Sequence, residues 1–451
     1  MATGVHPVTD EPNLTIRNIS TLVTMEPTMG HGKLGILHGA TIHASGGTIS
    51  SIETAEDVRL LPDARRSGSA GAEIDATGLI AIPGLVNAHH HLYQSILRGL
   101  GANEDLVGWF QARAPFLERY TSTARFHAVR LSLLECIGSG VTTVFEFASN
   151  TRNQGDVEQT LRAAEQLPVR MVLGYQPPPG DPPSLASVIT LCGDHPAIER
   201  LFCIPGAVIP ERNDDAQFAR FTSLVEQARR DGLGIATHAL EHRKERDNGS
   251  LRVLQDVGAL GPDTVLAHCI HLMPSDIEVL ARTNTRAVYN PMSNMRLGSG
   301  IMPLSKLHEA HICVALGSDG ATADSGDFFS AMRSGIGLQR ALHQTPEVCS
   351  YERILRMATI EGAEALGLSE KIGSIAVGKC ADLVLIDPNA ANFACGIDPV
   401  AQVVFSAQPR NVHTVILRGK PVLRNGAVMH IDADEIVAGA AQAAQQIAGS
   451  L

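Results

Sequence analysis

The stretch PGLVNAHHHLYQSILRG, residues 83–99, decides the fold that the sequence predicts. Apolar residues 81–86 predict a short buried strand, interrupted by the Pro-Gly pair at its centre. Residues two apart in a strand point the same way, so His89 and His91 can aim at one point while His90 points elsewhere. Two imidazoles on one side of a strand are half of a tetrahedral site for a divalent metal. Because buried polar groups need a partner, we expect a metal site here rather than a His-rich loop.

Other polar residues also come directly after apolar runs of strand length, and His238, His268 and Asp319 are three of them. Between the runs lie helical patterns such as Thr123–Ile137 and Asp215–Arg230, and this alternation predicts parallel strands with crossover helices. A (β/α)8 barrel carries its chemistry at the carboxyl ends of its strands. The sequence has eight candidate strand ends, near His89, Glu146, Tyr175, Pro205, His238, His268, Asn290 and Asp319.

The words around these residues resemble the amidohydrolase superfamily. They are PGLVNAHHH, THALE, LAHCIHL, NPMSNMRLGSG and GSDGA, and the resemblance runs from about Leu14 to about Asn425. The branch that they resemble contains nucleobase and adenosine-analogue deaminases, guanine deaminases and triazine hydrolases. The resemblance implies a hydrolase that acts on a C–N bond of a cyclic amidine.

The expected fold class is α/β, a (β/α)8 TIM barrel with a small β-sandwich domain built from both chain termini. Short β-like runs punctuated by Gly and Ser fill residues 14–80 and return near the end of the chain. We therefore expect residues 1–80 to form the N-terminal part of the sandwich, after a loose tail. Residues 81–370 form the barrel, and residues 371–451 complete the sandwich and end in a helix at Asp434–Ile447.

The predicted metal ligands are His89, His91, His238 and Asp319, which suit one divalent metal per chain, Zn²⁺ or alternatively Fe²⁺. Many amidohydrolases hold two metals bridged by a carboxylated lysine at the end of strand four. This chain has no lysine between Lys33 and Lys244, so that bridge cannot form. The alternatives are a core histidine for His238 and a helix cap for Asp319.

Glu241, His268 and Asp319 are the predicted catalytic residues. In the deaminases that the chain resembles, the glutamate at the place of Glu241 protonates the ring nitrogen of the substrate. Asp319 would also accept a proton from the water, and His268 would hydrogen-bond that water or the tetrahedral intermediate. The alternatives are a surface ion pair of Glu241 with Arg243 or Lys244, and His268 as a fifth metal ligand.

The predicted substrate-binding residues follow the histidine motif or lie in the loop after strand seven. Trp109 would cover a flat ring, and Gln94 offers a donor and an acceptor to a heterocycle edge. Core packing for Trp109 and a structural role for Arg98 are the alternatives. Residues 204–211, IPGAVIPE, lack the histidine that nucleoside deaminases often carry, which favours a base-sized or triazine-sized substrate. The full set is Tyr93, Gln94, Arg98, Trp109, Asn290 and Asn294.

The predicted function is a metal-dependent hydrolytic deaminase of a nitrogen heteroaromatic ring, such as a purine, pyrimidine or aminotriazine. The alternatives are a triazine chlorohydrolase or N-alkylaminohydrolase, a urea-type amidohydrolase, and a non-catalytic relative. A net charge of −11 without basic runs argues against a nucleic-acid partner, and no apolar run predicts a membrane span. The eight scattered cysteines and the absence of a secretory signal favour a cytoplasmic protein, which we expect to be a homo-oligomer, a dimer or tetramer.

Overall fold

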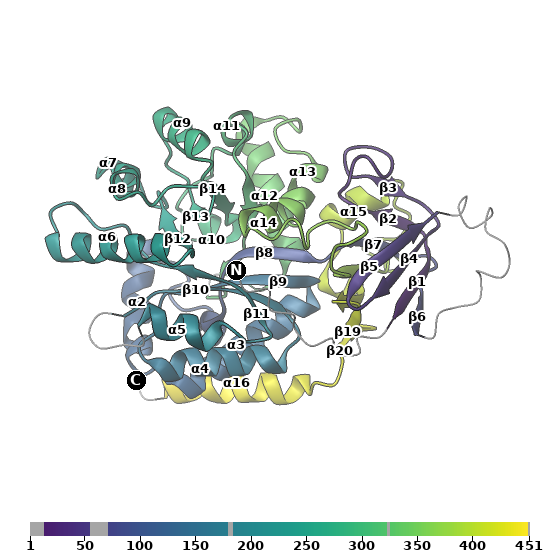
Figure 1. Ribbon diagram of the computed structural model, residues 1–451, viewed down its shortest axis with the longest axis horizontal. Coiled ribbons are helices and arrows are strands. Elements are labelled where there is room, and N and C mark those ends of the chain that lie inside the picture. Colours follow the sequence, from purple (N-terminus) through teal and green to yellow (C-terminus); the bar gives the residue numbers. More distant parts are fainter. Residues whose placement is uncertain (1–12, 55–70, 179–183, 323–324, 450–451) are drawn as a thin grey trace.

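The computed structural model describes residues 13–54, 71–178, 184–322 and 325–449, and most of the predicted N-terminal tail lies outside them. The central element is a parallel sheet in the order β15-β14-β13-β12-β11-β10-β9-β8-β16 (Figure 1). Its strands are β8 (Leu85–His91), β9 (Val141–Ala148), β10 (Arg170–Tyr175), β11 (Ile198–Cys203), β12 (Gly234–Ala239), β13 (Thr264–His268), β14 (Arg286–Tyr289), β15 (Val314–Leu316) and β16 (Asp319–Gly320).

The sheet closes on itself, because β16 pairs with β8 at Asp319↔His90 and Gly320↔His91. Since β15 and β16 are separated by two residues only, the closed sheet is consistent with a (β/α)8 barrel. Its interior is filled by apolar side chains from neighbouring strands, among them Val86, Phe145 and Phe202. The predicted strand ends lie at or near the ends of these strands, which places the polar residues that follow them at one rim.

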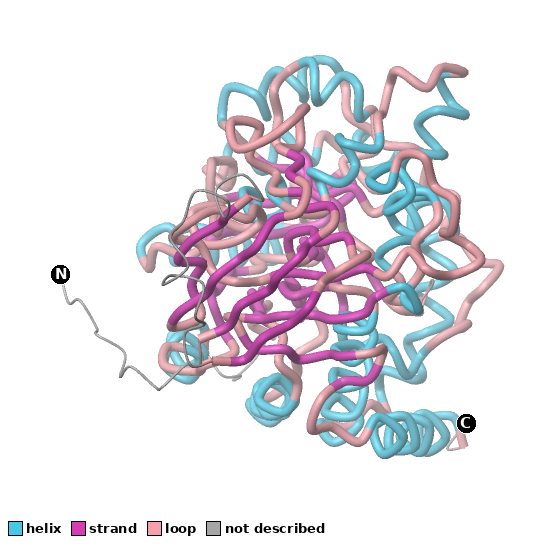
Figure 2. The backbone as a smooth tube through the Cα atoms, turned by 90° about the vertical axis from the view of Figure 1, so that its right-hand side faces the viewer, coloured by secondary structure: helices cyan, strands magenta, loops and turns pink. Residues whose placement is uncertain are grey.

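Helices surround the barrel sheet (Figure 1), and in Figure 2, which faces the right-hand side of Figure 1, helices lie above, below and to the right of the strands nearest the viewer, which belong to the smaller sheets described below. Several helices begin at a capping residue, as α3 does at Thr121, whose hydroxyl accepts from the N–H of Ala124. The barrel segment contains η2 (Leu92–Leu97), α2 (Leu106–Glu118), α3 (Ser122–Gly138), α4 (Gln154–Gln166), α5 (Leu185–Cys192), α6 (Asp215–Arg230), α7 (Arg243–Asp247), α8 (Ser250–Asp256), α9 (Pro274–Thr283), α10 (Pro291–Arg296), α11 (Leu304–Glu309), α12 (Phe328–His343), α13 (Tyr351–Met357) and α14 (Ile360–Ala365).

The apolar run at residues 81–86, predicted as one interrupted strand, is two strands in two different sheets. Strand β7 (Ile80–Pro83) pairs with strands of a smaller sheet, and β8 begins the barrel at Leu85. Gly84 lies between them, and only glycine fits there because a Cβ would lie 2.1 Å from Oγ1 of Thr142. The Gly84 N–H instead donates to the carbonyl of Asp382 at 2.9 Å, so this turn joins the barrel to the C-terminal segment.

Two smaller sheets are built from residues near both ends of the described chain. One has the order β5-β4-β1-β6 and the other β20-β19-β18-β17-β7-β2-β3. A common buried cluster joins them, with Ile16 and Ile42 from the first and Leu385 from the second. Their strands are β1 (Leu14–Ile19), β2 (Thr21–Val23), β3 (Ile36–Leu37), β4 (Ala40–Ser45), β5 (Thr48–Glu53), β6 (Ala72–Asp75), β17 (Leu383–Ile386), β18 (Val412–Leu417), β19 (Lys420–Arg424) and β20 (Ala427–Val428).

The C-terminal segment also contains α15 (Pro399–Phe405), η3 (Pro409–Asn411) and the predicted terminal helix, present as α16 (Ala433–Ala448). Helix α16 packs along α3, and Figure 1 shows it below the barrel. Its Ala440 and Ile447 belong to a buried cluster that includes Tyr93 of η2. Helix α16 therefore supports, from behind, the segment that follows the histidine motif.

Candidate metal centre

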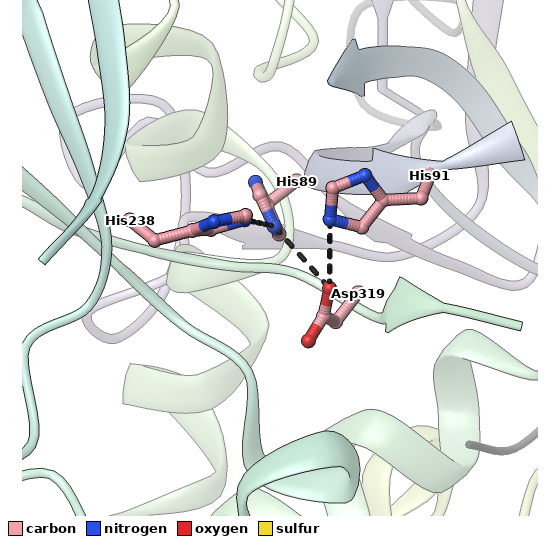
Figure 3. A group of neighbouring side chains, drawn as sticks. All are labelled: His89, His91, His238 and Asp319. Carbon is pink, nitrogen blue, oxygen red and sulfur yellow. Dashed lines mark hydrogen bonds and ion pairs between the residues drawn. The ribbon is translucent and has the colours of Figure 1, made fainter. Parts of the chain in front are cut away.

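His89, His91, His238 and Asp319 converge at the carboxyl rim of the barrel (Figure 3). The Nε2 atoms of His89 and His91 each lie 3.3 Å from Oδ1 of Asp319. The Nε2 atom of His238 lies 3.3 Å from that of His89. The four side chains come from β8, β12 and β16, so the closed sheet brings together residues that are distant in sequence.

Backbone carbonyls decide which nitrogen of two imidazoles carries hydrogen. The Nδ1 atom of His91 lies 2.9 Å from the carbonyl oxygen of Phe147, and the Nδ1 atom of His238 lies 2.9 Å from that of Ala207. A carbonyl only accepts, so in both neutral rings Nδ1 donates and Nε2 keeps its lone pair. This hydrogen bonding is typical of histidines that bind metal through Nε2.

The Nε2 atom of His91 faces a carboxylate oxygen of Asp319 at 3.3 Å, and although burial lowers the pKa of His91, this carboxylate raises it overall. When the ring is neutral, two acceptors oppose each other. A cation between them relieves this opposition, so the residues fit a divalent metal. Burial lowers the pKa of His89 and holds that of His238 well below its usual value, which keeps both rings neutral, as ligation requires. Burial alone would raise the pKa of Asp319, but the adjacent imidazoles of His89 and His91 hold it well below its usual value.

His90 lies outside the ligand group, as the strand geometry predicts. Its Nδ1 atom pairs with the backbone carbonyl of Asp319 and so ties β8 to β16. Asp319 itself has a φ of 61°, and His268 has a φ of 77°, both in the left-handed region. Such strained backbone positions in residues other than glycine collect at functional sites, where the surrounding structure holds them in place.

Glu241, His268 and Asp319 form a second cluster of ionisable side chains, which shares Asp319 with the metal-ligand candidates. Oε2 of Glu241 lies 3.5 Å from Nε2 of His268, whose distance to Oδ2 of Asp319 is 3.9 Å. Leu240, with a φ of 54°, turns the chain so that Glu241 is buried at the rim rather than on the surface. Lys244, one of its predicted surface partners, instead pairs with Glu211 at 3.1 Å.

The electrostatics of this group favour a neutral acid beside a neutral imidazole. Burial, reinforced by the carboxylate of Asp319, raises the pKa of Glu241 well above its usual value. Burial also lowers the pKa of His268 to about 3. Glu241 can therefore carry a proton at a pH where an exposed glutamate has lost it.

A cavity with an empty volume of about 530 Å³, solvent at its mouth included, opens over this group. Its walls include Gln94 and Trp109 from the predicted substrate-binding set, together with Glu241, His268 and Asp319. The amide of Gln94 already has internal partners, since its Oε1 accepts from Thr322 at 3.0 Å. Trp109 is 8% exposed, so its ring contributes to a wall of the cavity and to the packing behind it.

The other predicted substrate-binding residues lie outside the cavity wall. Arg98 pairs with Glu135 at the surface, so its predicted contact with substrate is not supported. Tyr93 is fully buried beside His91, with ring centroids 6.0 Å apart. Asn290 is fully buried as well, and the amide of Asn294 donates to Nδ1 of His268 at 2.8 Å.

Arg113 lines the cavity and was not among the predicted residues. It lies on α2, four residues after Trp109, and its guanidinium carbon is 4.1 Å from the centroid of a Trp109 ring. The spacing of four residues, which places two side chains on one face of a helix, is the signal that could have identified it. No helix was predicted at residues 106–118, so this signal had no element to refer to.

A closed parallel barrel with three convergent histidines and a carboxylate at its carboxyl rim defines a class of barrel proteins with a candidate metal centre. Residues 80–422 match the model of the amidohydrolase family, and the chain belongs to this family. The predicted family is thereby confirmed.

Curated relatives narrow the comparison to deaminases. The chain is 32% identical to a 5'-deoxyadenosine deaminase of Methanobrevibacter smithii, over 83% of this chain and 88% of the relative. It is 29% identical to a 5-methylthioadenosine/S-adenosylhomocysteine deaminase of Caldanaerobacter subterraneus subsp. tengcongensis, over 94% and 96% of the two chains. These relatives confirm the predicted reaction class, hydrolysis at a C–N bond.

Solved structures share the fold over nearly the whole chain. An adenosine deaminase from Xanthomonas campestris with bound zinc superposes with a TM-score of 0.84 at 24% identity, over 97% of this chain and 98% of the other. An atrazine chlorohydrolase from Arthrobacter aurescens TC1, complexed with zinc, gives a TM-score of 0.80 at 22% identity, over 96% and 100%. None of the helices in the described ranges is both long enough and apolar enough to span a bilayer.

Proposed function

We propose that this protein is a metal-dependent hydrolytic deaminase that replaces the exocyclic amine of a purine-type ring with oxygen and releases ammonia. The observation that carries the proposal is the buried acid Glu241 beside the four convergent metal-ligand candidates, at the wall of one cavity. The deaminase names of the relatives support the same reaction. The chlorohydrolase resembles this chain in fold alone, so we retain deamination as the function.

His89, His91, His238 and Asp319 would hold a single divalent metal, for which we propose zinc, with iron as the alternative. When bound, such an ion supplies Lewis acidity that makes a water molecule nucleophilic near neutral pH. Without lysine between Lys33 and Lys244, the end of β11 cannot supply the carboxylated bridge of a two-metal site. Metal analysis should give one equivalent per chain, lost in His91→Ala, and two equivalents at full activity would refute this part.

The side chains of the cavity have separate tasks in the proposed reaction. Glu241 gives its proton to the ring nitrogen next to the carbon that water attacks, because charge accumulates on that nitrogen. Asp319 takes a proton from the attacking water, and its low pKa keeps it ionised for this task. The Nε2–H of His268 stabilises the oxygen of the tetrahedral intermediate. The proton that Asp319 took from the water passes to the departing amine, which leaves as ammonia, and the proton of the new hydroxyl group returns to Glu241.

The amine-bearing substrate is either a nucleoside, as the names of the relatives suggest, or a free base. Ala207 and Val208 form part of the cavity wall in the loop after β11, where the nucleoside deaminases often have a histidine. A substrate in contact with this wall needs an apolar group there, which a 5'-deoxy or 5'-methylthio end provides and a 5'-hydroxyl does not. We therefore include both free bases and 5'-modified nucleosides among the test substrates.

An ammonia-release assay with zinc-loaded protein tests the function. The panel contains adenosine, 5'-deoxyadenosine, adenine, guanine, cytosine and a chlorinated aminotriazine, with chloride measured in parallel for the last. We expect ammonia from at least one purine, with a catalytic efficiency that reaches the lower end for natural substrates, roughly 10⁴ M⁻¹s⁻¹. Chloride release without ammonia from any purine would overturn the proposal.

We also propose that the two smaller sheets and their shared cluster constitute a β-sandwich domain. Its parts would be residues 1–80 and 371–451, and residues 81–370 would be the barrel domain. The common core of Ile16, Ile42 and Leu385 supports this division. A cytoplasmic location and a homo-oligomeric state stay predictions.

A further inference from the structure

Arg113 lines the cavity from α2, and its guanidinium lies over two aromatic rings. Its guanidinium carbon lies 4.1 Å from the Trp109 ring centroid and 4.5 Å from that of Phe110. One amino group donates to the hydroxyl of Tyr93 at 3.4 Å, a long hydrogen bond. Stacking on aromatic faces fixes the plane of the guanidinium and leaves its edge free to hydrogen-bond.

No aspartate or glutamate in the described part of the chain forms an ion pair with Arg113, whereas Arg130, Arg170 and Arg229 each have such a partner. Arg296, the other arginine of the cavity wall, donates to the carbonyls of Leu100 and Gly101 at 3.1 and 3.0 Å and so fixes a loop. A guanidinium has five N–H donors, and Arg113 uses one of them in the hydrogen bonds of this structure.

Arg113 and Glu241 line the same cavity. The charge of Arg113 also lowers the pKa of Glu241, against the larger effects of burial and of Asp319 that raise it. A substrate in this cavity therefore meets both the acid and the guanidinium. A cation there repels a protonated or cationic substrate and attracts one that carries an oxygen acceptor.

We propose that Arg113 is a specificity-determining residue that binds an oxygen acceptor of the substrate, a carbonyl oxygen on the ring or a carboxylate on its substituent. This inference rests on the proposed function and deepens it, because it selects oxygen-bearing amino heterocycles over plain aminopurines. A planar, stacked guanidinium is suited to such oxygens, since it can donate two parallel hydrogen bonds to them.

Three substrate pairs that differ only by the acceptor test this proposal. Guanine and 2-aminopurine differ by the oxygen on C6, and isoguanine and adenine by the oxygen on C2. Adenosine-5'-carboxylate and 5'-deoxyadenosine differ by a carboxylate at the end of the ribose. In at least one pair, the zinc-loaded wild-type enzyme should favour the oxygen-bearing member, and the pair that shows the preference identifies the source of the oxygen.

Arg113→Met keeps the apolar stem on Trp109 but removes the donors. Through Glu241 it can affect both members of a pair, so the decisive quantity is the ratio of their kcat/KM values. We expect that ratio to fall by roughly 10- to 100-fold, the range for a lost charge-assisted hydrogen bond. Arg119→Met, which removes an exposed guanidinium just after the same helix, is the matched control and should leave the ratio unchanged. An unchanged ratio in Arg113→Met, or no preference in any pair, would overturn the proposal.

A binding measurement separates this proposal from the proposed function. Trp109 is the only tryptophan of the chain, so its fluorescence reports directly on the ring beneath Arg113. In the Glu241→Gln background, titration with both members of each pair should show tighter binding of the oxygen-bearing member in at least one pair, and this preference should be lost when Arg113→Met is added. Such binding without ammonia from any wild-type assay would sustain the role of Arg113 and refute the deaminase. Equal binding of both members in all pairs would refute the role of Arg113 alone.

Discussion

His268 depends on a neighbour that has no contact with the cavity. The amide of Asn294, buried on α10, donates to Nδ1 of His268 at 2.8 Å. Because Nδ1 then accepts, the hydrogen of the neutral ring lies on Nε2, which faces Glu241 and Asp319. Asn294, predicted from sequence to bind substrate, is thus better described as a positioning residue.

Replacing Asn294 by Asp tests this role at the residue scale. A carboxylate accepts a hydrogen from Nδ1 and leaves Nε2 without one, so His268 can no longer donate toward the cavity. Turnover should fall by roughly 10- to 100-fold, as for other residues that orient a functional histidine. The ¹⁵N shifts of the His268 ring should report the change of tautomer, with metal content unaltered. A fall in turnover without a change of tautomer would contradict the assignment.

At the rim of the barrel, the buried carboxyl group of Glu146 connects β9 to η2. Glu146 near the end of β9 accepts from the N–H of Leu92, the first residue of η2, at 2.6 Å. Burial raises the pKa of Glu146 to about 7. Strand β9 and the segment after the histidine motif are therefore held together by a group that ionises near neutral pH.

Glu146→Gln should consequently change how stability depends on pH. The folded protein binds more protons than the unfolded chain between the ordinary pKa of 4.5 and about 7, so ionisation of Glu146 lowers stability as pH rises through this window. Gln keeps an acceptor for the N–H of Leu92 but carries no charge. Between pH 4 and pH 8, the free energy of unfolding of the variant should therefore rise relative to that of wild type by on the order of 3 kcal/mol. Denaturant unfolding at both pH values measures this change. If the variant and wild type differed in free energy of unfolding by the same amount at pH 4 and pH 8, the pKa of Glu146 would not be raised in the folded protein.

The elements that could be predicted from sequence are those with local signals. Apolar runs that end in His238, His268 and Asp319 identify barrel strands, and the apolar periodicity of Asp215–Arg230 predicts α6 with its observed bounds. The division of residues 81–86 between two sheets could not be predicted, because it depends on the pairing of β7 with β17 and of β8 with β9, which are distant in sequence. The roles of Arg113 and Asn294 depend on tertiary contacts with Trp109 and His268, which local sequence signals do not reveal.

At the scale of the whole molecule, a buried ion network joins the barrel to the C-terminal segment. Arg170, near the start of β10, pairs with Glu199 of β11 at 2.5 Å and with Asp382, next to β17, at 2.9 Å. All three side chains are at most 9% exposed. Glu199 also pairs at 2.6 Å with Lys371, whose side chain is 60% exposed.

Arg170→Met should destabilise the protein far more than Lys371→Met. Removing Arg170 leaves the buried carboxylate of Asp382 without its charged partner and leaves Glu199 to the more exposed Lys371 and Arg418, at a cost of roughly 3–5 kcal/mol. The pair with Lys371 is half in solvent, and its loss should cost about 1 kcal/mol or less. Unfolding by urea compares the two variants. Similar small losses would mean that the network does not hold the barrel and the C-terminal segment together.

The central claim is that Glu241 is the acid of a deaminase, and one substitution tests it most directly. Glu241→Gln keeps the shape of the side chain but cannot give up an acidic proton. With the best amine-bearing substrate of the panel, metal content should stay at the wild-type value while kcat falls by ~10²–10⁴, the range for a positioned general acid. The alkaline decline of wild-type activity, expected as pH rises through the raised pKa of Glu241, should disappear in the variant. Unchanged deamination by metal-replete Glu241→Gln would contradict the claim.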